Sequence, residues 1–203
     1  MAAGPAGRVG AHSLGQAPIG ADRVRAFFGL PVPESHRHAL EPYVARCASA
    51  APDFRWVAAS NLHLTVRFLG HVERALIERL ADVIEADGLE AFELQLGAEL
   101  GFFKRGRLAR VVWIGLAGGA EPAGALAENV EARCRQAGLE PETRAFNPHL
   151  TLARAKGRDG APLPALSAPP AMSAWRADEL ILYRSQMGRG GSVYEPLRRI
   201  RLR

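Results

Sequence analysis

The 203-residue sequence has no long apolar run, only two cysteines and very little lysine. No stretch approaches the roughly 18 consecutive apolar residues of a transmembrane helix, so we expect no membrane span. Cys47 and Cys134 lack metal-site spacing, which favours two inert thiols in a cytoplasmic protein. The sequence also lacks a Gly-rich phosphate loop and a nucleotidylated-lysine motif, which argues against ATP-driven chemistry.

The basic residues are therefore nearly all arginine. There are 26 Lys plus Arg against 21 Asp plus Glu, a formal net charge of +5. Guanidinium groups match phosphate oxygens well, so a phosphorylated or nucleic-acid partner is permitted but not required. The composition is that of an ordinary globular protein, and the length suits one domain or two small lobes.

Residues 1–22 are expected to be a flexible leader. They are rich in Ala, Gly and Pro and lack the apolar core of a secretory signal. Such a stretch buries too little apolar surface to offset the entropy lost on ordering. Residues 23–203 are expected to form a single bilobal domain.

Hydrophobic periodicity over residues 23–203 predicts an α+β protein. Period-two alternation and short apolar runs predict strands, and spacings of three and four predict helices. Pro42 is expected to kink or split the first helix, and the Pro- and Gly-rich stretch 155–170 predicts a loop. The expected strands are 24–30, 62–69 (ending at Gly70), 91–96, 100–104, 109–116, 149–154, and a closing hairpin of 177–185 and 193–201 with a flexible tip at Gly188, Gly190 and Gly191; the expected helices are 33–50, 73–86 and 121–137.

Two of the three threonines follow a histidine by two positions. Thr65 follows His63 and Thr151 follows His149, with a leucine between in both cases. Random placement of six histidines and three threonines would give roughly 0.09 such pairs, so the repetition is a strong signal. The copies lie 86 residues apart and suggest two similar lobes, each contributing one motif.

The motif spacing places both polar side chains on one face of a strand, because residues i and i+2 share a face. Two such strands facing each other would line a groove with two imidazoles and two hydroxyls. Hydrolysis of a phosphodiester needs a base for water and an acid for the leaving oxygen, and imidazole can serve as either near neutral pH. The hydroxyls can bind the non-bridging phosphate oxygens.

A zinc site is the main rival interpretation, since histidine is the commonest metal ligand. The motifs supply two histidines but no nearby Asp, Glu or Cys as a third ligand, so we expect no metal and no cofactor. His36 and His38 lie in helical sequence and are expected on the surface.

The motifs His63-Leu-Thr-Val and His149-Leu-Thr-Leu resemble the paired signature of the two-histidine phosphoesterase superfamily. The wider sequence resembles its RNA 2′,3′-cyclic phosphodiesterase branch, also called 2′-5′ RNA ligase-like. The matching stretches are 25–33, 55–70, 109–116, 146–154 and 180–202.

The resemblance implies a bilobal, pseudo-two-fold fold with two antiparallel-rich sheets, flanking helices and one motif strand from each lobe facing a central cleft. It also implies that His63 is the proton donor to the departing 3′ oxygen and His149 the proton acceptor from water, which leaves a 2′-phosphate. Thr65 and Thr151 would bind the phosphate oxygens. The expected partners are RNA with a 2′,3′-cyclic phosphate end or a nucleoside cyclic phosphate, and a monomer is expected.

Two arginines are further candidates for phosphate binding. Arg154 ends the second motif in a family-like position. It lies an odd number of residues after His149, so on a regular strand it would point to the opposite face, and a structural ion pair is an equal alternative. Arg67 has the parity to face the cleft. A base-stacking aromatic is expected for an RNA end, and the candidates are Phe102, Phe103 and Tyr194.

Other functions remain open. Reversal of the same chemistry would join a cyclic phosphate to a 5′-hydroxyl, as a weak 2′-5′ ligation. A non-catalytic module could hold phosphorylated RNA ends, although such binding would be served better by Arg or Lys than by paired His and Thr. The substrate could also be another cyclic phosphate or a small 2′-5′-linked molecule.

Overall fold

The computed structural model describes residues 22–188 and 191–203. The predicted leader lies outside this range except for Asp22, as does Gly190 of the predicted flexible tip. The elements follow one another as β1 (Arg23–Pro31), α1 (Glu34–Ala50), β2 (Phe54–Trp56), the 3-10 turn η1 (Ala59–Asn61), β3 (His63–Glu73), α2 (Arg74–Ala86), β4 (Phe92–Arg105), β5 (Leu108–Gly118), α3 (Ala120–Gln136), β6 (His149–Ala155), β7 (Trp175–Ala177), β8 (Glu179–Gly188) and β9 (Gly191–Arg201).

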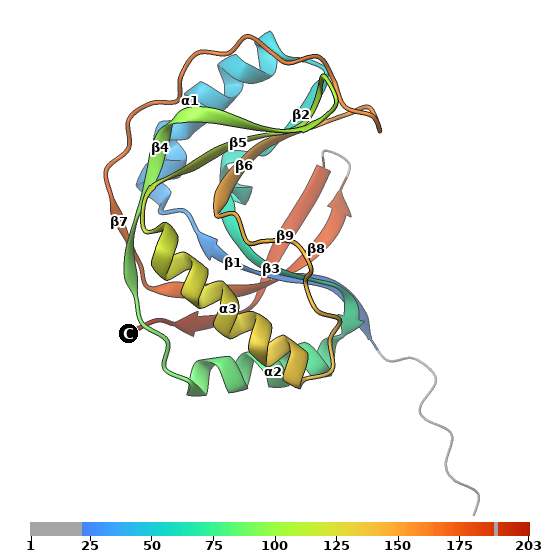
Figure 1. Ribbon diagram of the computed structural model, residues 1–203, viewed down its shortest axis with the longest axis vertical. Coiled ribbons are helices and arrows are strands. Elements are labelled where there is room, and N and C mark those ends of the chain that lie inside the picture. The colour runs from blue at the N-terminus through green and yellow to red at the C-terminus, as the bar shows by residue number, and fades with distance from the viewer. Residues whose placement is uncertain (1–21, 189–190) are drawn as a thin grey trace, which may run out of the picture.

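The strands of the described residues form one antiparallel sheet in the order β7-β4-β5-β6-β3-β1-β8-β9, with β2 paired to β6. β3 and β6 share a single register pair, Leu64 opposite Leu150. Figure 1 shows the sheet curving, with α1 at its upper end and α2 and α3 at its lower end. α1 packs beside β2, whereas α2 and α3 pack on each other and on β3. The predicted α+β class is therefore confirmed as an antiparallel-rich sheet with three helices.

The helices occur where the periodicity predicts them. α2 buries Ile77, Leu80 and Ile84 on one face, as its apolar spacing requires. α1 runs unbroken through Pro42, so the predicted split is wrong. Pro42 is exposed, and the carbonyl four residues before it can therefore bond water instead of a backbone N–H.

Three strand predictions need correction. β3 continues past Gly70 to Glu73, because Gly70 adopts φ 74° beside a register shift and lets the strand bulge rather than end. The two strands expected at 91–96 and 100–104 are one strand, β4, whose pairing with β5 is irregular between Leu96 and Leu100. The three-residue strands β2 and β7 escape prediction, because they are too short to show a period.

One face of the sheet carries the main hydrophobic core beneath the helices. Leu64 and Leu150 belong to it, at 2% and 0% exposure. His36, expected on the surface, is also buried: its Nε2 lies 2.9 Å from the Ser173 carbonyl oxygen, and its ring packs against Trp175. None of the helices in the described ranges combines the length and hydropathy that crossing a membrane requires.

Candidate active site

The two motif strands are neighbours in the sheet, and each begins with its histidine. Leu64 and Leu150, which pair with each other, point into the core, so His63 and His149 lie on the opposite, partly exposed face. The threonines share that face, as the motif spacing predicts. His149 is close enough to His63 to affect its protonation.

Backbone carbonyls fix the orientation of both imidazoles. His63 Nδ1 lies 2.7 Å from the Asn61 carbonyl oxygen, and His149 Nδ1 lies 2.6 Å from the Asn147 carbonyl oxygen. Because a carbonyl can only accept, we assign the proton of each neutral ring to Nδ1. Nε2 is then the atom available for proton transfer in both histidines. The Nε2 of His63 lies 3.1 Å from Thr65 Oγ1.

An aromatic side chain meets each histidine edge-on. Tyr194 lies 4.9 Å from His63 between ring centroids, and Phe103 lies 4.9 Å from His149. Phe102 packs instead against a second, smaller cluster of buried apolar residues, which includes Val112 and Ala153. Phe103 and Tyr194 are therefore the candidate stacking residues that the structure brings to the histidines.

Three further aromatic residues, which the sequence analysis did not single out, lie beside the two histidines. Phe27 and Tyr183 lie 4.7 and 5.9 Å from the His63 ring, and Trp113 lies 5.7 Å from the His149 ring. Glycines make room for these rings. A Cβ on Gly29 would lie 3.3 Å from His63 Cδ2, and one on Gly101 would lie 2.3 Å from the Trp113 indole.

This environment favours neutral imidazoles. Burial lowers the pKa of His63 to about 4, and the Arg154 and His149 charges add to that effect. Burial also lowers the pKa of His149, again with a contribution from Arg154. Both rings are thus favoured in their neutral form in the free protein, and an anion between them would favour their protonated forms.

A β-bulge after each motif reverses the parity of the residues that follow. The register between β1 and β3 shifts so that Val66 has no partner, and the register between β5 and β6 shifts so that Leu152 has none. A bulged residue moves its successors to the other face. Arg154 is consequently on the histidine side, where its charge acts on both imidazoles, and the parity argument against it fails.

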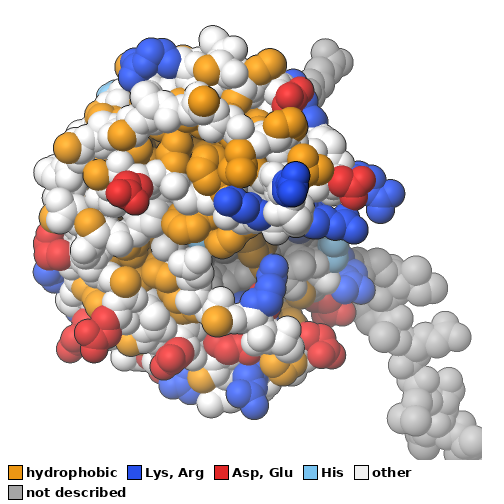
Figure 2. Space-filling model, turned by 45° about the horizontal axis from the view of Figure 1, so that its top comes forward, with side chains coloured by type: hydrophobic (Ala, Val, Ile, Leu, Met, Phe, Trp, Pro, Cys, Tyr) orange, Lys and Arg blue, Asp and Glu red, His pale blue; other side chains and the backbone are white. Residues whose placement is uncertain are grey.

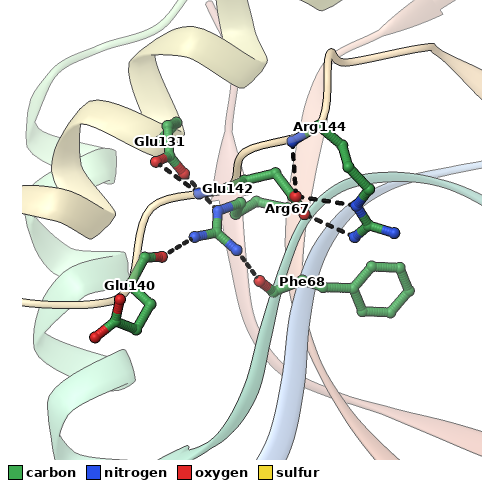
Figure 3. Close-up of polar contacts among 6 residues, drawn as sticks. All are labelled: Arg67, Phe68, Glu131, Glu140, Glu142 and Arg144. Carbon is green, nitrogen blue, oxygen red and sulfur yellow. Dashed lines mark hydrogen bonds and ion pairs between the residues drawn. The ribbon is translucent and has the colours of Figure 1, made fainter.

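The same reversal removes Arg67 from the histidine face, so the prediction that it faces the cleft is wrong. Arg67 is 9% exposed, and its guanidinium donates to Glu131, 2.5 Å away, and to the carbonyls of Phe68 and Glu140 (Figure 3). Glu131 also accepts from the backbone N–H of Glu142. Arg67 therefore anchors the segment that leads into β6.

The sequence signals for the missed residues were weak. Phe27 and Tyr183 belong to strands that the hydrophobic pattern predicts, but only the sheet order β3-β1-β8 shows that they lie beside His63. The described residues contain no group of three or more His, Cys, Asp or Glu side chains arranged to hold a metal ion.

Solved structures share this fold. The crystal structure of E. coli LigT complexed with 3′-AMP matches with a TM-score of 0.74 and 28% identity, covering 89% of this chain and 99% of that chain. A crystal structure from Thermus thermophilus matches with a TM-score of 0.72 and 26% identity, over 88% of this chain and 98% of that chain. The fold is thus that of the LigT-like phosphoesterases.

The sequence comparisons identify the family. Residues 32–189 match the 2′-5′ RNA ligase superfamily, and the chain belongs to that family. The RNA 2′,3′-cyclic phosphodiesterases of Methanothermobacter thermautotrophicus and Escherichia coli are 30% and 34% identical to it, over 89% and 86% of this chain and 100% and 94% of theirs. That of Aeropyrum pernix is 36% identical over 52% of this chain and 60% of its own length. The family and the phosphodiesterase class predicted from the sequence are confirmed.

Proposed function

We propose that this protein hydrolyses 2′,3′-cyclic phosphodiesters at RNA ends to 2′-phosphomonoesters by histidine acid–base catalysis without a metal. The observation that carries the proposal is the matched orientation of the two histidines. Each Nδ1 is held by the carbonyl two residues before it, so each Nε2 is left available on one face of the sheet. The names of the relatives supply the substrate class.

The proposed reaction uses one histidine in each protonation state. Neutral His149 accepts a proton at Nε2 from water, whose oxygen attacks phosphorus. The bond from phosphorus to the 3′ oxygen breaks, and protonated His63 donates its Nε2 proton to that oxygen. The negative charge of the bound substrate raises the pKa of His63 from its low value in the free protein, which makes the donor form accessible. The assignment of these two roles rests on the family resemblance.

Thr65, Thr151 and Arg154 would bind the non-bridging oxygens, whose charge grows in the transition state. Thr65 supports this role by its contact with His63 Nε2, because a phosphate oxygen at that nitrogen would also be within reach of the hydroxyl. Arg154 supports it by acting on both imidazoles. Arg67 is left out, because its donors are already used.

We also propose that the two motif strands are pseudo-two-fold copies in two lobes. Both read Asn-x-His-Leu-Thr, both hold the imidazole through the asparagine carbonyl, and both bulge directly afterwards. Such a symmetric site suits a reaction whose attacking and departing oxygens lie on opposite sides of phosphorus.

The test is incubation with nucleoside 2′,3′-cyclic phosphates in EDTA, with products separated by chromatography. We expect 2′-phosphate from the parent and a loss of at least 100-fold in kcat for His63→Ala and for His149→Ala. His71→Ala is the matched control, since His71 is an exposed histidine on the same strand, β3. An intact cyclic phosphate with and without divalent metal ions would contradict the proposal.

The same assay separates the remaining functions. Ligated product as the main outcome with a 5′-hydroxyl acceptor would favour 2′-5′ ligation. Retained binding of phosphorylated ends after loss of both histidines, with no turnover by the parent, would favour a binding module.

A further inference from the structure

The segment between α3 and β6 carries the Asn147 carbonyl that holds the His149 imidazole. Residues 140–148, which lie within the described part of the chain, form no helix or strand and make no backbone–backbone hydrogen bond. The segment before His63, by contrast, contains the 3-10 turn η1, which backbone hydrogen bonds close. The two histidines are therefore oriented by carbonyls of very different support.

Charged side chains bind the backbone of this segment instead. Arg67 Nη2 donates to the Glu140 carbonyl oxygen, 2.5 Å away. Glu131 Oε1 accepts from the Glu142 backbone N–H at 3.1 Å. Glu142 in turn accepts from the backbone N–H of Arg144, at 3.1 Å, and pairs with its guanidinium. Arg67 and Glu131 bond to each other, 2.5 Å from Nε to Oε2, so these attachments form one network (Figure 3).

The ion pair between Arg67 and Glu131 lies largely out of water. Its side chains are 10% and 23% exposed, whereas Figure 2 shows many Lys, Arg, Asp and Glu side chains on the outer surface. An ion pair withdrawn from water incurs a desolvation cost that only good geometry offsets. Glu131 meets that condition, because each of its carboxylate oxygens accepts a hydrogen bond. The pair is therefore a fixed point to which the segment is attached.

The network also supplies a second connection between the two motif strands. In the described ranges β3 and β6 share one register pair, Leu64 opposite Leu150. Arg67, three residues beyond Leu64 on β3, is bonded to the segment that leads into β6. Two separate points of attachment fix the direction of one strand relative to the other, and hence the place of His149 relative to His63.

We infer that Glu131 is a positioning residue for His149. Together with Arg67 it holds the segment whose Asn147 carbonyl fixes the imidazole, and so it fixes the direction in which Nε2 points. The inference rests on the proposed function, in which His149 accepts the proton of the attacking water. Glu131 acts through the backbone and not on the substrate, so its loss should lower kcat and leave KM unchanged.

The first experiment measures kcat and KM for a nucleoside 2′,3′-cyclic phosphate in two variants of Glu131. We expect Glu131→Ala to lower kcat about ten-fold or more, with KM within about two-fold of the parent. Glu131→Gln should lower kcat by less, about three-fold, because its single amide oxygen can replace only one of the two acceptors. If the alanine variant does not fold, the glutamine variant alone decides the question.

Asp87→Ala is the matched control. Asp87 pairs with Arg133, which lies on α3 two residues after Glu131, and its side chain is similarly covered, at 19% exposure. This pair has no bond to residues 140–148, so its loss should leave kcat unchanged. The inference is overturned by a parent-like kcat in the Glu131 variants, by an equal fall in Asp87→Ala, or by a rise in KM at unchanged kcat.

The imidazole tautomers separate failure of the inference from failure of the proposed function. Nitrogen-15 NMR shows which ring nitrogen carries the proton, whether or not the protein turns over substrate. We expect the proton at Nδ1 of both His63 and His149 in the parent, and a mixture of tautomers at His149 alone in the Glu131 variants. The His149 signals are those that disappear in His149→Gln.

An unchanged His149 tautomer, or an equal change at His63, would reject the positioning role even if the parent is active. A change confined to His149 in a protein without turnover would support the role of Glu131 and contradict the proposed function instead.

Discussion

The Asn61 side chain donates a hydrogen bond to the Ser192 carbonyl, 2.8 Å away, while the Asn61 backbone carbonyl accepts from His63 Nδ1. One residue thus joins the end of the β8–β9 hairpin to a proposed catalytic histidine. The same hairpin carries Tyr194 against the His63 ring. The corresponding residue in the other motif, Asn147, holds His149 through its carbonyl, but its amide makes no hydrogen bond among the described residues.

Asn61→Ala is expected to lower kcat/KM several-fold and stability by about 1 kcal/mol, because the hairpin loses a hydrogen bond at the site. Asn147→Ala should change both quantities much less, since only its backbone is used. Steady-state kinetics and urea unfolding of the two variants provide the comparison. Equal losses in both would show that the link to Ser192 has no particular role.

Stability is expected to fall as the pH falls from about 6.5 to 4. Above pH 6.5 His63 is neutral in both the folded and unfolded chains and contributes nothing. Between its unfolded value and its folded pKa of about 4, the unfolded chain binds a proton that the folded chain does not. This difference should cost about 1 to 3 kcal/mol by pH 4. Urea unfolding at several pH values would measure it, and His63→Gln should flatten the slope in this range.

Gly101→Ala should lower activity because the added Cβ would collide with a side chain. The backbone at Gly101 does not have a positive φ, so the substitution does not strain the backbone itself. The added Cβ would lie 2.3 Å from the Trp113 indole, which packs beside His149. Displacing the indole should cost about ten-fold or more in kcat/KM. Gly124→Ala in α3 is the control: its Cβ would meet open space, and the helix should gain up to about 1 kcal/mol. Unchanged activity in Gly101→Ala would show that the indole does not position His149.

Arg67→Lys should destabilise the protein by about 2 to 4 kcal/mol while leaving KM for a cyclic phosphate within about two-fold of the parent. Lysine cannot reproduce the three donors that reach Glu131 and the two carbonyls. Urea unfolding and kinetics well below the melting temperature measure the two effects. A large rise in KM at unchanged stability would instead indicate that Arg67 binds the phosphate.

The sequence identifies the motif strands and the longer elements because each shows a regular spacing of apolar and polar residues within its own segment. His63 and His149 are found from spacing alone, and the leucines between histidine and threonine are buried as that spacing requires. Helix α2 shows its core face in the same way.

The motif spacing could not show that Arg154, and not Arg67, lies on the histidine face of the sheet. Parity counted along the chain assumes a regular strand, and one unpaired residue at Val66 or Leu152 reverses it. The bulge is visible only in the pairing with a partner strand. Neighbours such as Tyr183 and Trp113 are likewise set by sheet order and not by any local pattern.

The chain order of these neighbours has a consequence for biosynthesis. His63 is synthesised before the residues that enclose its ring, because Tyr183 and Tyr194 lie more than a hundred residues later in the sequence. Strand β1, which carries Phe27, lies between β3 and β8 in the sheet, so it must keep one edge open until β8 has been synthesised. A nascent chain should therefore lack the enclosed His63 site until β8 and β9, which carry Tyr183 and Tyr194, have been synthesised.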